Sequence, residues 1–237
     1  MSSNVSVTGA DSLGDWRVVT STVVAALPTA GTALAMMALF FTVGSSPVPN
    51  TATLVYGLAN VAVVVGLFRW LPADARRSVF RYDRPSTGEL AAAVALAVVS
   101  VGLVAPAVFR VTSALGLRGG PSVATFESAG GALVVGVGAI LIAPVAEEVL
   151  FRGLLFGTLL ARFGPRVAIL GSSAAFGAIH VFLGGVPSVV EAAVLGVGFA
   201  AVRHRYANLV GVGVAHALIN AYYVAAGVGI LPSPVGG

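Results

Sequence analysis

Residues 130–163 read GGALVVGVGAILIAPVAEEVLFRGLLFGTLLARF, an apolar run interrupted by the adjacent carboxylates Glu147 and Glu148 and by Arg152. As one helix this stretch would be about 50 Å long, at 1.5 Å per residue, whereas a hydrocarbon core is roughly 30 Å thick. Pro144 lies just before the two glutamates, and proline kinks or ends a helix. We therefore expect either one kinked helix or two helices here, in surroundings that hardly tolerate charge.

The rest of the chain is equally apolar. Of its 237 residues, 57% are hydrophobic and 9% are charged, whereas a soluble domain has about 25% charged residues. Apolar runs of about 20 residues, long enough to cross a hydrocarbon core, recur along most of the chain. The sequence predicts an all-α fold, a polytopic membrane bundle of seven or eight transmembrane helices, with further spans at 18–43, 51–71, 91–109, 167–183, 188–202 and 209–231.

Polar residues divide the chain into parts. Residues 1–16 are expected to form a disordered tail, residues 17–128 a transmembrane scaffold whose spans contain essentially no charge, and residues 129–231 a helical core, followed by a tail at 232–237. The loop after the second expected span holds the densest basic cluster, namely Arg76, Arg77, Arg81 and Arg84. By the positive-inside rule we expect this loop and the N-terminus on the cytoplasmic side of the cell membrane.

Charge and cysteine content exclude several classes of function. The net charge is +4, and all 13 basic residues are arginines, but they form no basic helix and no RNA-binding motif. We therefore expect membrane lipids, and no nucleic acid, as partners of the basic surface. The chain has no cysteine, which excludes disulfides, thiol catalysis and cysteine metal ligands.

Ionisable side chains inside a membrane are costly and are candidates for a functional site. Here they are confined to the C-terminal half: Glu147, Glu148, Arg152, His180, Glu191 and His216. Glu148 precedes Arg152 by four residues, the favourable order for a helical ion pair, so this pair is expected to be mainly structural. Glu147 is rotated by about 100° from Glu148 on a helix and needs another partner.

Chain geometry suggests His180 as that partner. The tight turn FGPR is centred near Gly164, and Glu147 lies 17 residues before this glycine while His180 lies 16 after it. In an antiparallel helix pair the two side chains would meet at one height. Phe176 and His180 are four residues apart and share a helix face. A single intramembrane histidine can also be a satisfied core residue or a contact between helices.

The last span adds two polar groups on one face. His216 and Asn220 are four residues apart, so three helices could offer Glu147, His180, His216 and Asn220 to one cavity. Glu191 lies four residues after Pro187 and is expected near a membrane surface, outside the site.

Two chemistries suit a glutamate, two histidines and an asparagine in a dry pocket. In one, Glu147, His180 and His216 hold Zn²⁺ or another divalent metal with an open position for water. In the other, Glu147 with His180 deprotonates a water, while His216 and Asn220 hold the oxyanion of a tetrahedral intermediate. Both describe hydrolysis of an acyl bond. The HExxH spacing of soluble zinc proteases is missing, and this favours neither route.

Three motifs occur in this order in successive expected spans: EExxxR (Glu147, Glu148, Arg152), FxxxH (Phe176, His180) and HxxxN (His216, Asn220). Together they resemble the CPBP family of intramembrane proteases, which includes the type II CAAX prenyl endopeptidases and the Abi, or bacteriocin-processing, proteins. The resemblance covers residues 141–222, and residues 129–231 would then form the catalytic core.

The resemblance implies hydrolysis of a peptide bond by a water activated at Glu147 and His180, with His216 and Asn220 completing the site. Supporting roles fall to the remaining motif residues, Glu148, Arg152 and Phe176. The family includes proteins described as metalloproteases and as metal-independent glutamate proteases, so metal dependence stays open. The substrate would be a peptide or protein, with prenylated C-termini among the candidates. The alternatives are a proton-coupled transporter, disfavoured because repeated halves are missing, and a non-catalytic membrane scaffold.

Overall fold

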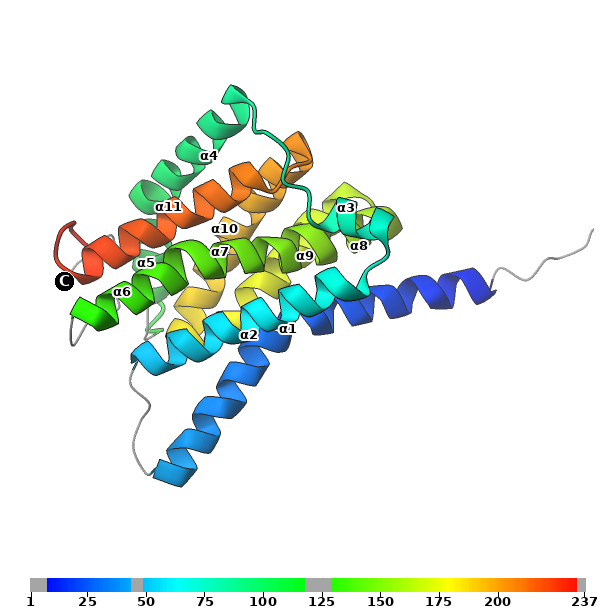
Figure 1. Cartoon of the computed structure of the whole chain (residues 1–237). Coiled ribbons are helices and arrows are strands. Elements are labelled where there is room, and N and C mark those ends of the chain that lie inside the picture. The colour runs from blue at the N-terminus through cyan, green and yellow to red at the C-terminus, as the bar shows by residue number, and fades with distance from the viewer. Residues whose placement is uncertain (1–7, 44–48, 118–128, 234–237) are drawn as a thin grey trace, which may run out of the picture.

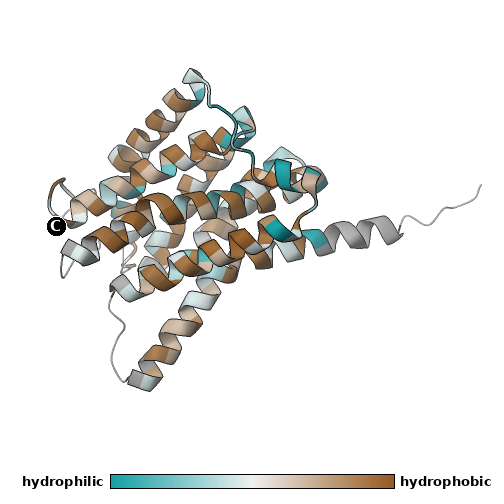
Figure 2. Ribbon diagram, viewed as in Figure 1, coloured by the Kyte–Doolittle hydropathy of each residue, from teal (hydrophilic) through white to brown (hydrophobic). Residues whose placement is uncertain are grey.

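The computed structural model describes residues 8–43, 49–117 and 129–233, and within these ranges the chain is helical with no strand. In the described part of the chain, six helices are long and apolar enough to cross a membrane, and Pro165–Ile179 is a shorter apolar helix. The helices run roughly side by side in one bundle (Figure 1), and hydrophobic residues cover most of their surface (Figure 2). The predicted all-α membrane bundle is thus confirmed.

The helices follow one another without other regular structure in the described ranges, and three of them are short π-helical segments, labelled η. Their bounds are α1 Thr8–Val43, α2 Pro49–Trp70, α3 Ala73–Val79, α4 Thr87–Val99, η1 Ser100–Val104, α5 Ala105–Ala114, α6 Ala129–Val137, η2 Gly138–Ile142, α7 Ala143–Glu147, η3 Glu148–Leu155, α8 Phe156–Phe163, α9 Pro165–Ile179, α10 Val181–Tyr206 and α11 Val210–Gly227.

Residues 129–163, the segment that the sequence left ambiguous, form one continuous helical rod from α6 to α8. Pro144 does not end the rod, because it lies in the first turn of α7, just after the π-helical turn η2, and a side chain from another helix replaces its missing N–H as a donor. A second π-helical segment, η3, begins at Glu148. Such segments are frequent at functional sites because they rotate side chains out of the ordinary helical phase.

The N-terminal tail differs from expectation. Helix α1 begins at Thr8, so residues 8–16 are helical and not disordered, while residues 1–7 lie outside the described part of the chain. No proline occurs before Pro28, so nothing in this stretch of sequence interrupts the helix. Of the expected C-terminal tail, residues 232–233 have no regular structure and residues 234–237 lie outside the described ranges.

Helix α10 is interrupted near its start. Gly184 and Gly185 leave helical geometry, and Gly185 has a φ of 68°, a conformation that favours glycine. Pro187 follows as one of the first residues of the regular helix. The expected break between the spans 167–183 and 188–202 is therefore present inside α10, and α9 ends earlier than predicted, at Ile179.

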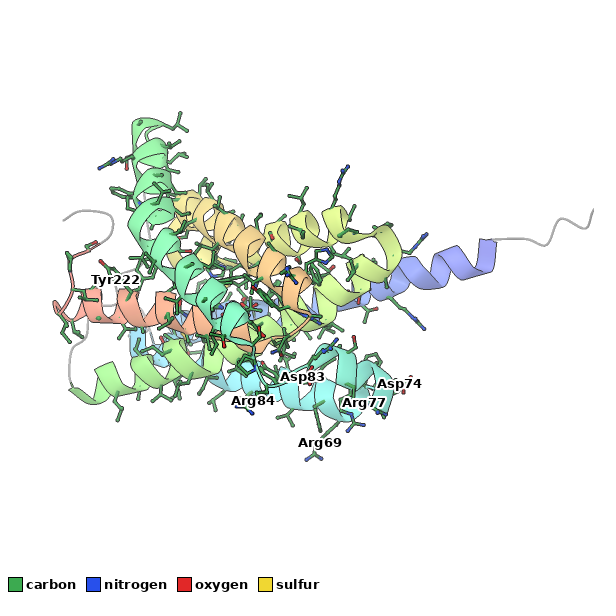
Figure 3. All side chains as sticks on the ribbon, turned by 90° about the horizontal axis from the view of Figure 1, so that it is seen from above. Arg69, Asp74, Arg77, Asp83, Arg84 and Tyr222 are labelled. Atoms are coloured by element: carbon green, nitrogen blue, oxygen red, sulfur yellow. The ribbon has the colours of Figure 1, made fainter. Side chains whose placement is uncertain are left out.

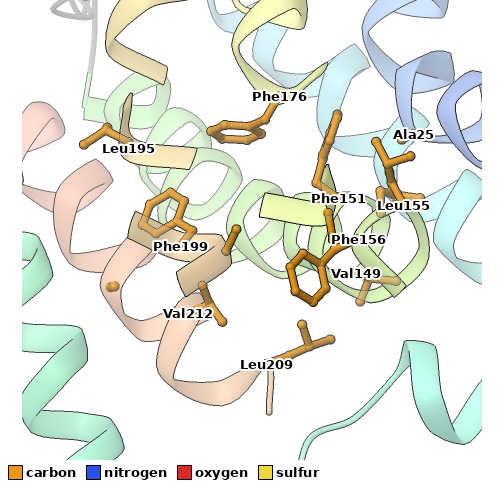
Figure 4. Packing of buried hydrophobic residues seen from close by; sticks show 14 of the residues in the cluster. Ala25, Val149, Phe151, Leu155, Phe156, Phe176, Leu195, Phe199, Leu209 and Val212 are labelled. Carbon is orange, nitrogen blue, oxygen red and sulfur yellow. The ribbon is translucent and has the colours of Figure 1, made fainter. Parts of the chain in front are cut away.

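The C-terminal half forms the centre of the bundle. In the Leu133–Phe163 and Gly184–Tyr206 spans, 50% of the residues in the most apolar 18-residue stretch are buried inside the protein. In the first three spans this share is 11–22%. The buried rings of Phe151, Phe176 and Phe199 come together from η3, α9 and α10 (Figure 4). Packing there is close: a Cβ on Gly177 would lie 2.7 Å from the Val189 carbonyl oxygen on α10. The first three spans therefore leave most of their surface to lipid.

Candidate active site

A cavity of about 710 Å³ opens between α1, α2, the α6–α7 rod, α9, α10 and α11. Its lining includes the four side chains that the sequence analysis singled out, namely Glu147, His180, His216 and Asn220. The other lining residues are mostly apolar. The structure therefore places a small polar group in an otherwise apolar cavity inside the membrane bundle.

Glu148 and Arg152 form the ion pair expected from their spacing. The Arg152 Nη1 lies 3.3 Å from the Glu148 Oε1, and neither side chain is exposed. The Arg152 guanidinium also stacks 4.2 Å from the ring centre of Phe176 and donates to the Gly196 carbonyl oxygen at 3.4 Å. Phe199 provides a second ring, 5.0 Å away. This charge is thus held by a carboxylate, a backbone carbonyl and two aromatic faces.

His216 lies between the two glutamates. Its Nδ1 is 2.8 Å from Glu148 Oε1, and its Nε2 is 3.8 Å from Glu147 Oε2. Because a carboxylate only accepts hydrogen bonds, Nδ1 carries the proton of the first contact. The ring stacks on Phe199, with 5.0 Å between ring centres. The orientation of His216 is therefore set by Glu148 and Phe199, and its Nε2 is directed toward Glu147.

Glu147 has a partner that the sequence analysis missed. The Tyr56 hydroxyl on α2 donates to Glu147 Oε1 at 2.7 Å, while Glu147 Oε2 is buried and has no protein hydrogen-bond partner. Tyr56 is four residues before Asn60, whose amide donates to the Tyr56 carbonyl oxygen. A polar pair at this spacing in an apolar span is the signal that could have identified α2 as part of the site.

The expected direct pairing of Glu147 with His180 does not occur among the described residues. His180 ends α9, and its Nδ1 lies 2.7 Å from the Phe176 carbonyl oxygen of the preceding turn. This local hydrogen bond places the proton on Nδ1 and leaves a lone pair on Nε2. The two residues share the cavity wall without touching because α9 ends at Ile179, which lets the ring fold back onto its own helix.

Asn220 is held by the π-helical turn η2. Its Nδ2 donates to the Ala139 carbonyl oxygen at 2.7 Å. In η2 the Ala143 N–H donates to the Gly138 carbonyl oxygen, five residues earlier. At the same spacing the donor to the Ala139 carbonyl oxygen would be Pro144, which has no N–H. Asn220 therefore satisfies a buried carbonyl that the proline leaves without a donor. One amide hydrogen serves this role, and the Asn220 side chain also lines the cavity.

The position of Glu191 differs from the one that the sequence predicted. It was expected near a membrane surface, but its side chain is 7% exposed, lines the same cavity and accepts a hydrogen bond from the Tyr223 hydroxyl. Glu191 lies on the regular part of α10 that follows the glycine break, and there it lines the cavity. Tyr223 was also missed, although it lies seven residues after His216 and so on the same face of α11.

Tyr82, in the loop outside the spans, contacts the rod next to the site. Its hydroxyl donates to the Val145 carbonyl oxygen at 3.3 Å. Burial raises the pKa of Tyr82 above its ordinary value, and the negative charge of Glu148 raises this pKa further. Tyr82 therefore stays protonated at neutral pH and remains a donor to Val145.

The charges of the cluster do not balance. Glu147, Glu148 and Arg152 together have one negative charge in excess when both carboxylates are ionised, and one oxygen of each carboxylate, Oε2, has no partner. In a low-dielectric interior such an excess is removed by a proton or a bound cation. His216 lies between the two carboxylates, with Nε2 facing Glu147 and Nδ1 facing Glu148.

The donor types also suit a divalent metal ion. The described residues contain no group of three His, Cys, Asp or Glu side chains arranged to hold a metal. The chemistry nevertheless fits, because Glu147, His180 and His216 are typical zinc ligands. Each of the three is oriented by a further hydrogen bond, as is usual around metal sites. Glu147 accepts one from Tyr56, His180 donates one to the Phe176 carbonyl oxygen, and His216 donates one to Glu148.

Fold and site together define a polytopic helical membrane protein with a carboxylate, imidazole and amide group in a cavity between its spans. Residues 129–222 match the family model "Type II CAAX prenyl endopeptidase Rce1-like". This segment is thus similar to the Rce1-like CAAX endopeptidases, which agrees with the resemblance carried by the three motifs. Neither the curated proteins nor the solved structures give a significant match.

Proposed function

We propose that this protein is an intramembrane endopeptidase in which a water molecule activated by Glu147 attacks a peptide bond. One observation carries the proposal: Glu147 Oε2 is buried without a protein partner and lies 3.8 Å from His216 Nε2 in a cavity within the bundle. That separation is too long for a direct hydrogen bond, so the two atoms suit a third group between them.

The proposed reaction uses the lone pair of Glu147. Glu147 removes a proton from the water as its oxygen bonds to the carbonyl carbon of the substrate, which forms a tetrahedral oxyanion. Donors on protonated His216 and on Asn220 stabilise the oxyanion. When the C–N bond breaks, Glu147 returns the proton to the leaving amine. His180, whose ring is fixed by the Phe176 carbonyl, orients the water through its Nε2.

The remaining motif residues support this chemistry. Glu148 holds the Nδ1 side of the His216 ring, while Arg152 balances the charge of Glu148. Phe176 packs against His180 and against the Arg152 guanidinium. A divalent metal ion bound in the cavity would be held by Glu147, His180 and His216, and it would supply a Lewis acid that acidifies water.

The arrangement of arginines supports a cytoplasmic position for one end of the bundle. The Leu209 N–H donates to the Arg81 carbonyl oxygen, and Asn208 bonds to the backbone of Asp83, so the α10–α11 turn lies beside the arginine-rich loop. Charged residues on and around α3 gather at this end (Figure 3). We infer that this end and the N-terminus face the cytoplasm of the cell.

The proposal is tested with the purified full-length chain in liposomes and a peptide ending in a CAAX-type sequence, with and without a prenyl group. We expect cleavage at one bond, found by mass spectrometry of the products. Addition of a chelator separates the two routes: activity that survives supports the glutamate route, and activity lost and restored by Zn²⁺ supports the metal route. If both peptides stay intact at every metal concentration, the non-catalytic scaffold replaces the protease.

Replacing Tyr56 by phenylalanine should lower kcat by about tenfold while KM changes little, because a lost hydrogen bond to a charged group is worth roughly 1.5–3 kcal/mol. Without the hydroxyl, Glu147 Oε1 loses its donor and the carboxylate is free to turn away from His216. Steady-state kinetics on a cleaved peptide measure the effect. Tyr222→Phe is the matched control, since that hydroxyl bonds to the Pro232 carbonyl outside the cavity. An unchanged kcat in Tyr56→Phe would remove the positioning role.

A further inference from the structure

The cavity contains a second carboxylate that the proposed reaction does not use. Glu191 on α10 is 7% exposed and accepts a hydrogen bond from the Tyr223 hydroxyl on α11. Both residues line the same cavity as Glu147. Their neighbours on the wall are the apolar Ala192, Leu195 and Val224 and the polar Ser188 and Asn220.

The Glu191–Tyr223 pair lies at a definite distance from the reaction centre. Tyr223 is seven residues after His216 on α11, and Glu191 is eight residues before Phe199 on α10. At 1.5 Å per residue, both helices place the pair about 10–12 Å along their axes from the stacked His216 and Phe199 rings. An extended peptide advances about 3.3 Å per residue, so the pair lies about three substrate residues from the bond at Glu147.

The chemistry of the cavity wall around Glu191 favours a positively charged substrate group. A buried carboxylate is stable in an apolar wall only when it is protonated or paired, and Tyr223 supplies a neutral donor to one oxygen. The described lining of the cavity includes two carboxylates and two histidines but no arginine. A substrate ammonium or guanidinium would complete the pairing of Glu191, whereas a substrate carboxylate would meet a like charge.

We propose that Glu191 and Tyr223 form a substrate subsite that takes a lysine or arginine side chain about three residues from the cleaved bond. This inference rests on the proposed protease function and extends it to the sequence that is cleaved. It predicts discrimination by charge at one substrate position, and it disfavours a substrate whose free C-terminal carboxylate reaches this pair.

The test uses the full-length protein in liposomes and a peptide series in which Arg, Gln or Glu occupies each position up to four residues on either side of the cleaved bond. We expect kcat/KM to be about tenfold or more higher for Arg than for Gln at one position, the usual size of a charged hydrogen bond, and lowest for Glu. Glu191→Gln should abolish this preference, and Glu191→Arg should reverse it. Tyr223→Phe should weaken it, whereas Tyr222→Phe, the adjacent tyrosine outside the cavity lining, should leave it unchanged.

A binding measurement separates this inference from the proposed function. The Glu147→Gln protein should still bind the Arg peptide about tenfold more tightly than the Gln peptide, and adding Glu191→Gln should remove the difference. If the protein binds the Arg peptide preferentially but the wild type cleaves no peptide, the proposed protease function is wrong and the proposed subsite stands. If the wild type cleaves the Arg, Gln and Glu peptides at equal rates for every position, the proposed subsite is wrong and the proposed protease function stands.

Discussion

Glu147→Gln is expected to lower kcat by about 10²- to 10⁴-fold, the range that general acid–base catalysis contributes. The amide has nearly the shape of the carboxylate but cannot take a proton from water. Glu147 Oε2 is the buried oxygen without a protein partner that faces His216, so its basicity is removed while the cavity is kept. His180→Ala should also remove most activity, because it takes away the group that orients the water.

Peptide cleavage by purified variants measures this effect, and the melting temperature of each variant shows that it is folded. Asp74→Asn is the matched control, since it makes the same change at an exposed carboxylate on α3, away from the cavity. Its rate should equal that of the wild type. Turnover of Glu147→Gln within a few-fold of the wild type would exclude Glu147 as the base, and would leave the match of residues 129–222 to the Rce1-like family model untouched.

Arg152→Gln and Glu148→Gln should each lower the free energy of unfolding by about 3–5 kcal/mol, because truncating one partner of a buried ion pair leaves the other charge unpaired. Neither side chain is exposed, and each has further contacts within the bundle. Arg152 would also lose its stacking on Phe176 and its bond to the Gly196 carbonyl. Loss of Glu148 frees His216, so activity should fall together with stability.

Thermal unfolding in one detergent gives the ranking of the single variants, the double variant and a control. The double variant Glu148→Gln with Arg152→Gln should be less destabilised than the sum of the singles, because it leaves no unpaired charge. Arg166→Gln, at an exposed arginine near the start of α9, should leave the melting temperature unchanged. Wild-type stability in both single variants would contradict the burial of the pair.

Local periodicity accounts for the parts of the structure that were predicted correctly. Apolar runs predicted the spans, because any helix in lipid must cover its backbone with apolar side chains. The spacing of Glu148 and Arg152 predicted their ion pair, since residues four apart meet on a helix. The same rule placed His216 and Asn220 on one face of α11, and both line the cavity.

Errors arose where a contact depends on how helices end or rotate. Glu191 was assigned to a membrane surface from its distance to Pro187, but it lies on the regular part of α10 that follows the glycine break, where it is buried and lines the cavity. The predicted pairing of Glu147 with His180 assumed two regular antiparallel helices that extend equally far from the Gly164 turn. Helix α9 ends at Ile179, and the His180 ring bonds to its own last turn.

The sequence by itself determined the membrane bundle, the buried ion pair and the similarity of residues 129–222 to Rce1-like proteins, because these follow from composition, helical spacing and short motifs. Only the tertiary structure decided which partners surround Glu147. The Tyr56 hydroxyl comes from a helix that lies 91 residues earlier in the chain and outside the matched segment. The π-helical turns on either side of Glu147 set which way each carboxylate points. Both depend on packing between helices, and the spacing of residues along one helix does not encode it.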